Sequence, residues 1–344
     1  MRSAAASPLL LLFAACAGEG PGTVYIEDFH DRSPMLACSV ADVPGPPAGV
    51  LRLKAVGDSL LVAIAGGDRE IVLFGPDFSV RARVRWEEEG PLGLADPVDV
   101  DLVGDTLLVV AERGRARLTF VDLRGVQRGH IPLGFVPNRL LRDGDGWLVS
   151  AVPLSPTQGE ILYRVGGARP EPMGIAPVHE ATPQIKALAN ATVMVRAGDG
   201  RVVVAHQYVR ALAHLVALPP EGRGRATVRD VAVPLADGVA GAVGFRPGPP
   251  FTDEAMRRLL APVLEAAPDP PGGGILYLTR TGRMSGDFWE KALVRVDADM
   301  TYLASWTLPV NVGPFAWLPR RGEVVGVAAD ERWYRCPIPP GGGT

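Results

Sequence analysis

Apolar residues in this chain come in short runs that recur along its length, each opened by a glycine or acidic turn. Every run continues into aliphatic and β-branched residues, which is typical of β-strands. The recurring phrases are GDSLLVAIA (57–65), GDTLLVVAE (104–112), DGWLVSAVP (145–153), DGRVVVAHQ (199–207), GGILYLTRT (273–281) and GEVVGVAAD (322–330). Most are followed by a second run of the same kind, and several by a third.

The spacing of these phrases predicts the architecture. The first two begin 47 residues apart, the next pair 41 and the last pair 49. Repeats of about 40 to 50 residues with several strands each are typical of β-propeller blades. We therefore expect an all-β fold, a six-bladed β-propeller forming a single domain over residues 23–340. The stretch 208–272 breaks the period, so a seventh blade remains an alternative.

A proline precedes the expected innermost strand in several repeats. The segments are Asp96-Pro97-Val98-Asp99, Val136-Pro137-Asn138-Arg139, Thr182-Pro183-Gln184-Ile185 and Gly313-Pro314-Phe315-Ala316. Proline lacks a backbone donor and is tolerated at the first residue of a strand. The repetition indicates equivalent turns at one end of a central channel.

Residues 252–266 are predicted to form a short helical insertion. Met256, Leu259 and Val263 follow helical spacing, and Thr252 is a suitable first residue. Pro262 predicts a kink or an early end. Such a helix packs over one face of the ring or acts as a lid, and the sequence leaves both open.

The N-terminus predicts export. Arg2 and the apolar run up to Ala15 make residues 1–15 a signal peptide. The segment Leu12-Phe13-Ala14-Ala15-Cys16 resembles the lipobox of bacterial lipoproteins, with Phe13 where leucine is usual. That resemblance implies a diacylglycerol on Cys16 and a flexible tether over residues 16–22. The alternative is an ordinary secreted protein whose leader ends near a cysteine.

Two further cysteines, Cys38 and Cys336, lie near opposite ends of the chain. An exported protein can form disulfides. In a propeller the two termini usually meet in one blade, so a bridge between these cysteines would close the ring. Two separately buried thiols are the alternative.

The leader, the six repeats and the helical insertion together resemble the six-bladed propeller lipoproteins of bacteria, whose architecture is related to NHL-type and TolB-like propellers. The resemblance implies a lipid-anchored, extracytoplasmic ring in the bacterial cell envelope, periplasmic or at the cell surface. It implies no active site, because proteins of this architecture have diverse functions.

Charge and motifs exclude several functions. The formal net charge is −3, and arginines stand singly rather than in a basic stripe, so we expect no nucleic-acid partner. The five histidines show no paired metal-binding spacing, and His206 is interpreted as a hydrogen-bonded core residue. No serine lies in a GxSxG turn.

Polar residues beside the repeated prolines are the candidate ligand-binding residues at the channel mouth. They are Asp96, Asp99, Asn138, Arg139, Gln184 and Lys186. The first hypothesis is a non-enzymatic binding or scaffolding module without a cofactor, whose partner is an envelope protein or a small extracytoplasmic ligand. The alternative is a calcium-dependent hydrolase of the lactonase type, with oxygen ligands from Asp99, Asn138, Gln184 and Asn311. Converging oxygen atoms would favour the enzyme, and an arginine-lined mouth would favour the binding module.

Overall fold

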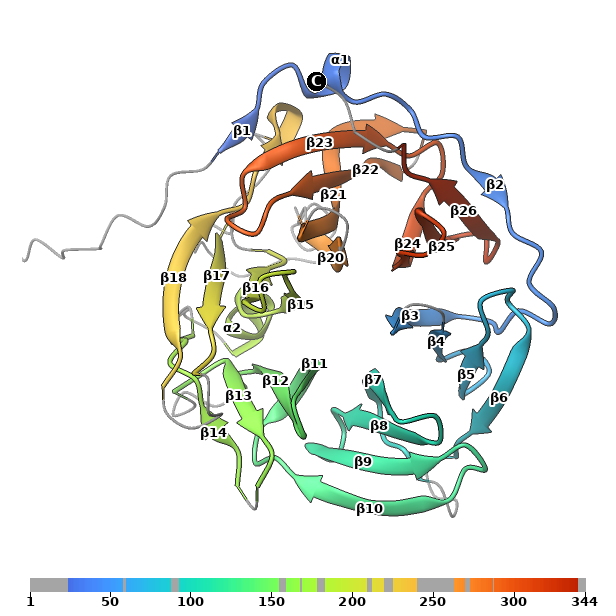
Figure 1. The fold of residues 1–344 in the computed structure, drawn as a ribbon, viewed down its shortest axis with the longest axis vertical. Helices are drawn as coiled ribbons and strands as arrows, with labels where there is room; N and C mark the ends of the chain where they lie inside the picture. The colour runs from blue at the N-terminus through green and yellow to red at the C-terminus, as the bar shows by residue number, and fades with distance from the viewer. Residues whose placement is uncertain are drawn as a thin grey trace, which may run out of the picture.

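The computed structural model describes residues 24–57, 60–87, 93–154, 159–167, 169–177, 183–208, 212–219, 225–239, 263–269, 273–286 and 288–339. Six four-stranded antiparallel sheets stand around a common centre as blades (Figure 1). The described residues therefore form a six-bladed β-propeller, as the repeats predict.

In five blades the strands follow chain order from the channel outward. Blade 1 holds β3 (Val50–Val56), β4 (Leu60–Ala65), β5 (Glu70–Phe74) and β6 (Val80–Arg85). Blade 2 holds β7 (Pro97–Val103), β8 (Leu107–Glu112), β9 (Arg117–Asp122) and β10 (Gln127–Pro132). Blade 3 holds β11 (Val136–Asp143), β12 (Gly146–Val152), β13 (Leu162–Val165) and β14 (Glu171–Pro172). Blade 4 holds β15 (Thr192–Arg196), β16 (Val202–His206), β17 (Leu212–Ala217) and β18 (Thr227–Ala232). Blade 5 holds β20 (Val263–Asp269), β21 (Gly274–Ser285), β22 (Phe288–Val296) and β23 (Tyr302–Thr307).

Blade 6 joins the two ends of the chain. Its inner strands are β24 (Val312–Leu318), β25 (Glu323–Ala328) and β26 (Trp333–Pro337), and its outer strand is β2 (Ser39–Val40). Cys38 and Cys336 form a disulfide with an S–S distance of 2.05 Å, one residue before β2 and within β26. Of the two states that the sequence leaves open, the structure contains the bridge.

The segment before β2 runs along the outside of the ring (Figure 1). Strand β1 (Tyr25–Ile26) pairs in parallel with β19 (Leu235–Ala236), which leads into the 3-10 turn η1 (Asp237–Val239). Helix α1 (Phe29–Arg32) follows, and Met35 then bridges to Thr307 at the end of β23. The N-terminal segment therefore straps blades 4, 5 and 6 together before it completes the last blade.

The hydrophobic core lies between neighbouring blades. Alternate residues of a strand point to opposite faces of its sheet. In β4, Leu61 packs with the core shared by blades 1 and 6, whereas Val62 packs with the core shared by blades 1 and 2. Aromatic pairs reinforce two of these layers: the ring centroids of Phe74 and Trp333 are 5.3 Å apart, and those of Phe120 and Trp147 are 5.5 Å apart.

Two local predictions are wrong. Residues 263–266, the end of the predicted helix, begin strand β20, where Val263 pairs with Thr279. The apolar positions in this short stretch fit the periodicity of a helix as well as that of a strand, and pairing with β21 stabilises the strand. Pro183 starts helix α2 (Pro183–Ala189) instead of a strand. Proline fits this position because N–H groups in the first turn of a helix make no hydrogen bond within the helix.

Several expectations lie outside the described residues: the signal peptide, Cys16 with its tether, and residues 252–262 of the predicted helix. Across the described part of the chain, no helix combines the length and the apolar character that a membrane crossing requires.

Candidate functional site

The innermost strands of four blades share a β-bulge near their first residues. The pairing register shifts between Val50 and Arg52, Pro97 and Asp99, Pro137 and Arg139, and Val263 and Glu265. A bulge adds one residue to a strand and re-aims the side chain that follows it. In all four strands that side chain is ionisable, and together they form a cluster of charges in the channel.

This channel cluster consists of Arg52, Asp99, Arg139 and Glu265. The Nε of Arg52 donates to Asp99 Oδ1 at 3.1 Å, and its Nη1 donates to Glu265 Oε2. Arg139 Nη2 lies 3.7 Å from the same oxygen of Glu265. None of the four side chains is more than 14% exposed. Blades 1, 2, 3 and 5 are thus connected through the centre of the ring.

Asp99 is the most enclosed member of the channel cluster. Burial alone would raise the pKa of its carboxyl group, but the charges of Arg52, Lys54 and Arg139 lower that pKa to about 2. The backbone N–H of Leu140 also donates to Asp99 Oδ2 at 2.8 Å. Asp99 therefore holds its negative charge at every physiological pH.

The hydrogen bonds of Arg139 are less complete than those of Asp99. Burial and the neighbouring charge of Arg52 lower the pKa of its guanidinium to about 9, and Asp99 opposes that effect. The group stays protonated at neutral pH. Its Nε is buried and has no hydrogen-bond partner, whereas Nη1 donates to the carbonyl of Asn138 at 3.1 Å.

The structure brings three of the predicted residues together and separates the others. Asp99, Asn138 and Arg139 lie at the channel cluster, with Asn138 Nδ2 donating to the carbonyl of Thr192 at 2.8 Å. Asp96 is exposed at the rim, where it pairs with Arg113 at 3.5 Å. Lys186 is buried on helix α2. The side chain of Gln184 lies outside the described residues.

Arg52 and Glu265 are functional candidates that the sequence reasoning missed. Like Asp99 and Arg139, both directly follow the register shift near the start of an innermost strand. Aligning the first residues of the strands finds Arg52. Glu265 was hidden, because residues 252–266 were assigned to a helix.

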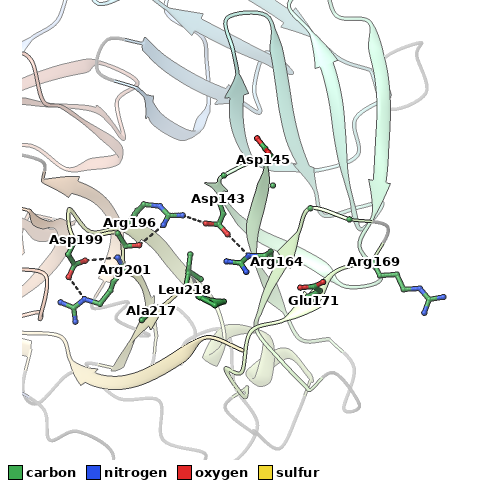
Figure 2. A pocket seen from close by; sticks show the side chains of 16 residues that line it. Asp143, Asp145, Arg164, Arg169, Glu171, Arg196, Asp199, Arg201, Ala217 and Leu218 are labelled. Atoms are coloured by element: carbon green, nitrogen blue, oxygen red, sulfur yellow. Dashed lines mark hydrogen bonds and ion pairs between the residues drawn. The ribbon is translucent and has the colours of Figure 1, made fainter. Parts of the chain in front are cut away.

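A separate pocket lies at the opposite ends of the innermost strands, between blades 3 and 4 (Figure 2). Its volume is about 940 Å³. Strand β11 ends there at Asp143 and β15 ends there at Arg196, while Arg164 comes from β13. We call it the Arg164 pocket. Its charged lining residues are Asp143, Asp145, Arg164, Arg169, Glu171, Arg196, Asp199 and Arg201.

Asp143 lies between two guanidinium groups on the wall of the Arg164 pocket (Figure 2). Arg164 Nε donates to its Oδ2 at 2.8 Å, and Arg196 Nη2 donates to its Oδ1 at 3.0 Å. Arg196 is further fixed by the carbonyl groups of Arg142 and Gly200, each at 2.9 Å. The carboxylate of Asp143 therefore accepts hydrogen bonds from two arginines that belong to different blades.

Arg164 has unused donor capacity. The residue is only 9% exposed, and its Nη1 has no hydrogen-bond partner. A buried N–H without a partner is costly, and in native proteins it is often satisfied by a bound water, ion or ligand. Arg169 points away from this group in Figure 2.

Blade 4 also contains a buried pair of histidines. His206 Nδ1 donates to the carbonyl of Ala189 at 2.8 Å, and its Nε2 lies 3.0 Å from Nε2 of His214. His214 Nδ1 lies 2.6 Å from Asp230 Oδ1. A neutral His206 that donates through Nδ1 accepts through Nε2. Burial, and then the charge of His214, lower the pKa of His206 to about 4.

No protein-family model matches the sequence, and no curated protein matches it. Solved structures show the same fold. A member of the DUF4221 family from Bacteroides vulgatus has a TM-score of 0.60 and 9% identity, over 89% of this chain and 98% of that one. The calcium-binding protein regucalcin from Agrobacterium tumefaciens has a TM-score of 0.57 and 14% identity, over 93% and 97%. A gluconolactonase from Xanthomonas campestris has a TM-score of 0.55 and 14% identity, over 93% and 95%.

The described channel residues do not fit a calcium ion. Calcium requires six to eight converging oxygen ligands. Here the guanidinium of Arg52 contacts both carboxylates, Asp99 and Glu265. Asn311 lines hollows at the surface near Phe288. Among the described residues, no three His, Cys, Asp or Glu side chains gather in a way that would hold a metal ion.

Proposed function

We propose that this protein is a binding module of the bacterial cell envelope, anchored through a lipid on Cys16, that takes a small anionic ligand in the Arg164 pocket. The observation that carries the proposal is the buried guanidinium of Arg164, whose Nη1 has no partner in a pocket of about 940 Å³. The ring then serves as a rigid support for the binding site.

Hydrogen-bond donors favour an anion at this wall. Two guanidinium groups share the carboxylate of Asp143, although the whole lining balances four arginines with four carboxylates. The planar fork of an arginine matches a carboxylate or a phosphate group with two parallel hydrogen bonds. The pocket volume lies within the range of roughly 300 to 1,000 Å³ that small-molecule sites occupy.

The channel cluster supports binding over metal-assisted hydrolysis. Its carboxylates already face fixed cations, Arg52 and Arg139, so the mouth is lined by arginine rather than by converging oxygen ligands. We interpret the channel cluster as the connection that holds the blades in place. Calcium at millimolar concentration should then produce no binding signal in a titration.

The anchor is a separate part of the proposal and rests on residues 1–16. Metabolic labelling with an alkyne fatty acid should label the parent protein and leave the variant Cys16→Ser unlabelled. A labelled protein would reside in the envelope, where an exported ligand or another envelope protein is the expected partner.

The ligand site is tested by calorimetric titration with inorganic phosphate and with citrate, using glucose as the neutral comparison. We expect the two anions to bind and glucose to give no heat. Arg164→Lys keeps the charge but loses the fork, and should weaken anion binding about tenfold or more. The matched control is Arg128→Lys, which alters an arginine paired with Asp122 on blade 2.

The outcomes separate clearly. The anion site is wrong if neither anion binds to the folded parent protein, or if Arg164→Lys binds as the parent does. A decrease of the same size in Arg128→Lys would point to general charge effects instead. Urea unfolding of each variant verifies that the fold is retained.

A further inference from the structure

Strands β21 and β22 extend beyond their blade as a projecting ribbon. Strand β20 pairs with β21 only as far as Thr279, and β23 pairs with β22 only from Ala292. Between these points the two strands still pair with each other, through Arg280 with Lys291 and Ser285 with Phe288. We call residues 280–286 and 288–291 the ribbon. Within the described residues, no further strand pairs with it on either side.

The tip of the ribbon carries two exposed apolar side chains. Met284 is 54% exposed and Phe288 is 52% exposed. Met35, which is 66% exposed, lines a hollow of about 320 Å³ together with Phe288 and Val310. Phe288 and Val310 also line an adjoining hollow of about 310 Å³. Met35, Phe288 and Val310 therefore belong to one continuous surface, whereas Met284, the cross-strand partner of Trp289, points to the opposite face of the ribbon. Exposed apolar side chains on both faces of a projecting tip often mark an interaction site.

The base of the ribbon is firmly held. Thr281 Oγ1 donates to Glu290 Oε2 at 2.7 Å, and His30 Nδ1 lies 3.4 Å from the same oxygen. Gly282 has a φ of 84°, and a Cβ on it would clash with the carbonyl oxygen of Gly238. This close contact with η1 leaves no room for a side chain. The exposed tip is thus presented by a fixed support.

The chain leaves the domain beside this base. The carbonyl of Val24 accepts the N–H of Leu235, and the following residues lead to His30, which contacts the ribbon at Glu290. Cys16 precedes Val24 by eight residues (24 − 16). Eight extended residues span at most about 28 Å. A lipid on Cys16 would therefore hold this side of the propeller against the membrane surface.

We propose that the ribbon inserts Met284 and Phe288 into the interfacial layer of a lipid membrane, with Met35 and Val310 resting on that surface. The orientation rests on the lipid anchor of the proposed function, whereas the apolar tip is independent of it. A lipid surface suits a projecting tip because it adapts to the shape of the inserted side chains. A protein partner would need a complementary face of about 800 Å² on each side.

The test uses the mature chain from residue 16 with Cys16→Ser, so that no acyl chain contributes. Co-sedimentation with vesicles of phosphatidylethanolamine and phosphatidylglycerol gives the partition coefficient. We expect measurable partitioning that persists at high salt, because apolar contacts are not screened. The double variant Met284→Ser with Phe288→Ser should lower the coefficient roughly tenfold or more, since each buried apolar side chain contributes strongly.

The matched control replaces two exposed valines on blades 1 and 2, Val80→Ser with Val126→Ser, far from the ribbon in Figure 1. It should partition as the parent does. The proposal is overturned if the parent stays in solution with vesicles, or if the two double variants behave alike. It is also overturned if the tip variant abolishes a concentration-dependent dimer instead, which sedimentation velocity would reveal. Loss of labelling at Cys16 alone would remove the anchor and leave the ribbon result standing.

Discussion

The guanidinium of Arg52 lies 3.1 Å from the carboxylate of Asp99, although the two residues belong to the innermost strands of different blades. The same guanidinium reaches Glu265 on blade 5, across the channel. A hydrophobic core between adjacent blades fixes each blade to the next, but it does not connect blades that are not neighbours in the ring. The channel cluster supplies that second kind of connection.

Removing Arg52 should therefore destabilise the whole ring. Arg52→Met leaves the buried carboxylates of Asp99 and Glu265 without their main partner, which typically costs about 3 to 5 kcal/mol of unfolding free energy. Urea unfolding measures the loss. Arg128→Met, at an ion pair whose arginine side chain is 57% exposed, should change stability little. Equal stability of the two variants would show that the channel cluster adds nothing.

Stability should decrease in acid as Asp99 becomes protonated. Its pKa is about 2 in the folded protein and about 3.8 when unfolded, so the unfolded chain takes up the proton first as the pH falls. The stabilisation is complete above pH 4 and is lost between pH 4 and 2, with a size of about 2 kcal/mol at 1.36 kcal/mol per unit. Unfolding free energies over this range should show the slope in the parent and lack it in Asp99→Asn. A parallel slope in that variant would assign the effect to other carboxylates.

His206 predicts a second pH dependence at milder acidity. Its pKa is lowered from 6.5 to about 4. Between these two pH values the imidazole is therefore protonated in the unfolded state and neutral in the folded state. Stability should fall by about 3 kcal/mol between these values. His206→Asn, which can still donate to the carbonyl of Ala189, should flatten this part of the profile. The exposed His130→Asn is the control and should leave it intact.

The disulfide should contribute strongly to closure of the ring. Cys38 and Cys336 are 298 residues apart, and the chain-entropy relation gives roughly 6 kcal/mol for a loop of this length, as an upper limit. The double variant Cys38→Ser with Cys336→Ser should unfold at a lower urea concentration. Hydrogen exchange should rise first in β2 and β26, the strands that the bridge joins. Uniform protection across all blades in the reduced protein would contradict this order.

The sequence predicts the ring better than it predicts the site. Phrases such as GDTLLVVAE (104–112) form buried second strands, here β8, because runs of aliphatic residues fit a sheet covered on both faces. Pro97 and Pro137 lie at the start of innermost strands, as expected. Pro183 does not, because a helix also accepts proline in its first turn. Proline marks a boundary and does not say which element follows.

The two sites could not be predicted from the sequence for a different reason. Arg164, Asp143 and Arg196 come from three strands, and nothing in their local sequence marks them as neighbours. The bridge from Arg52 to Glu265 joins residues 213 positions apart. Contacts of this kind depend on how far each blade is rotated about the channel, a property of the assembled ring. Asp99 and Arg139 were found only because a proline precedes each of them by two residues.

Strand β2 gives the last blade its outer edge from the first described part of the chain, and this arrangement sets an order of events during synthesis. Residues 39 and 40 are made early, yet their partner β26 is made at the end. Five blades can assemble while the sixth still lacks its strands. If the chain is exported with its N-terminus first, Cys38 remains an unpaired thiol outside the membrane until Cys336 has also been exported. The sixth blade, and with it the disulfide, can therefore form only after β26 has crossed the membrane.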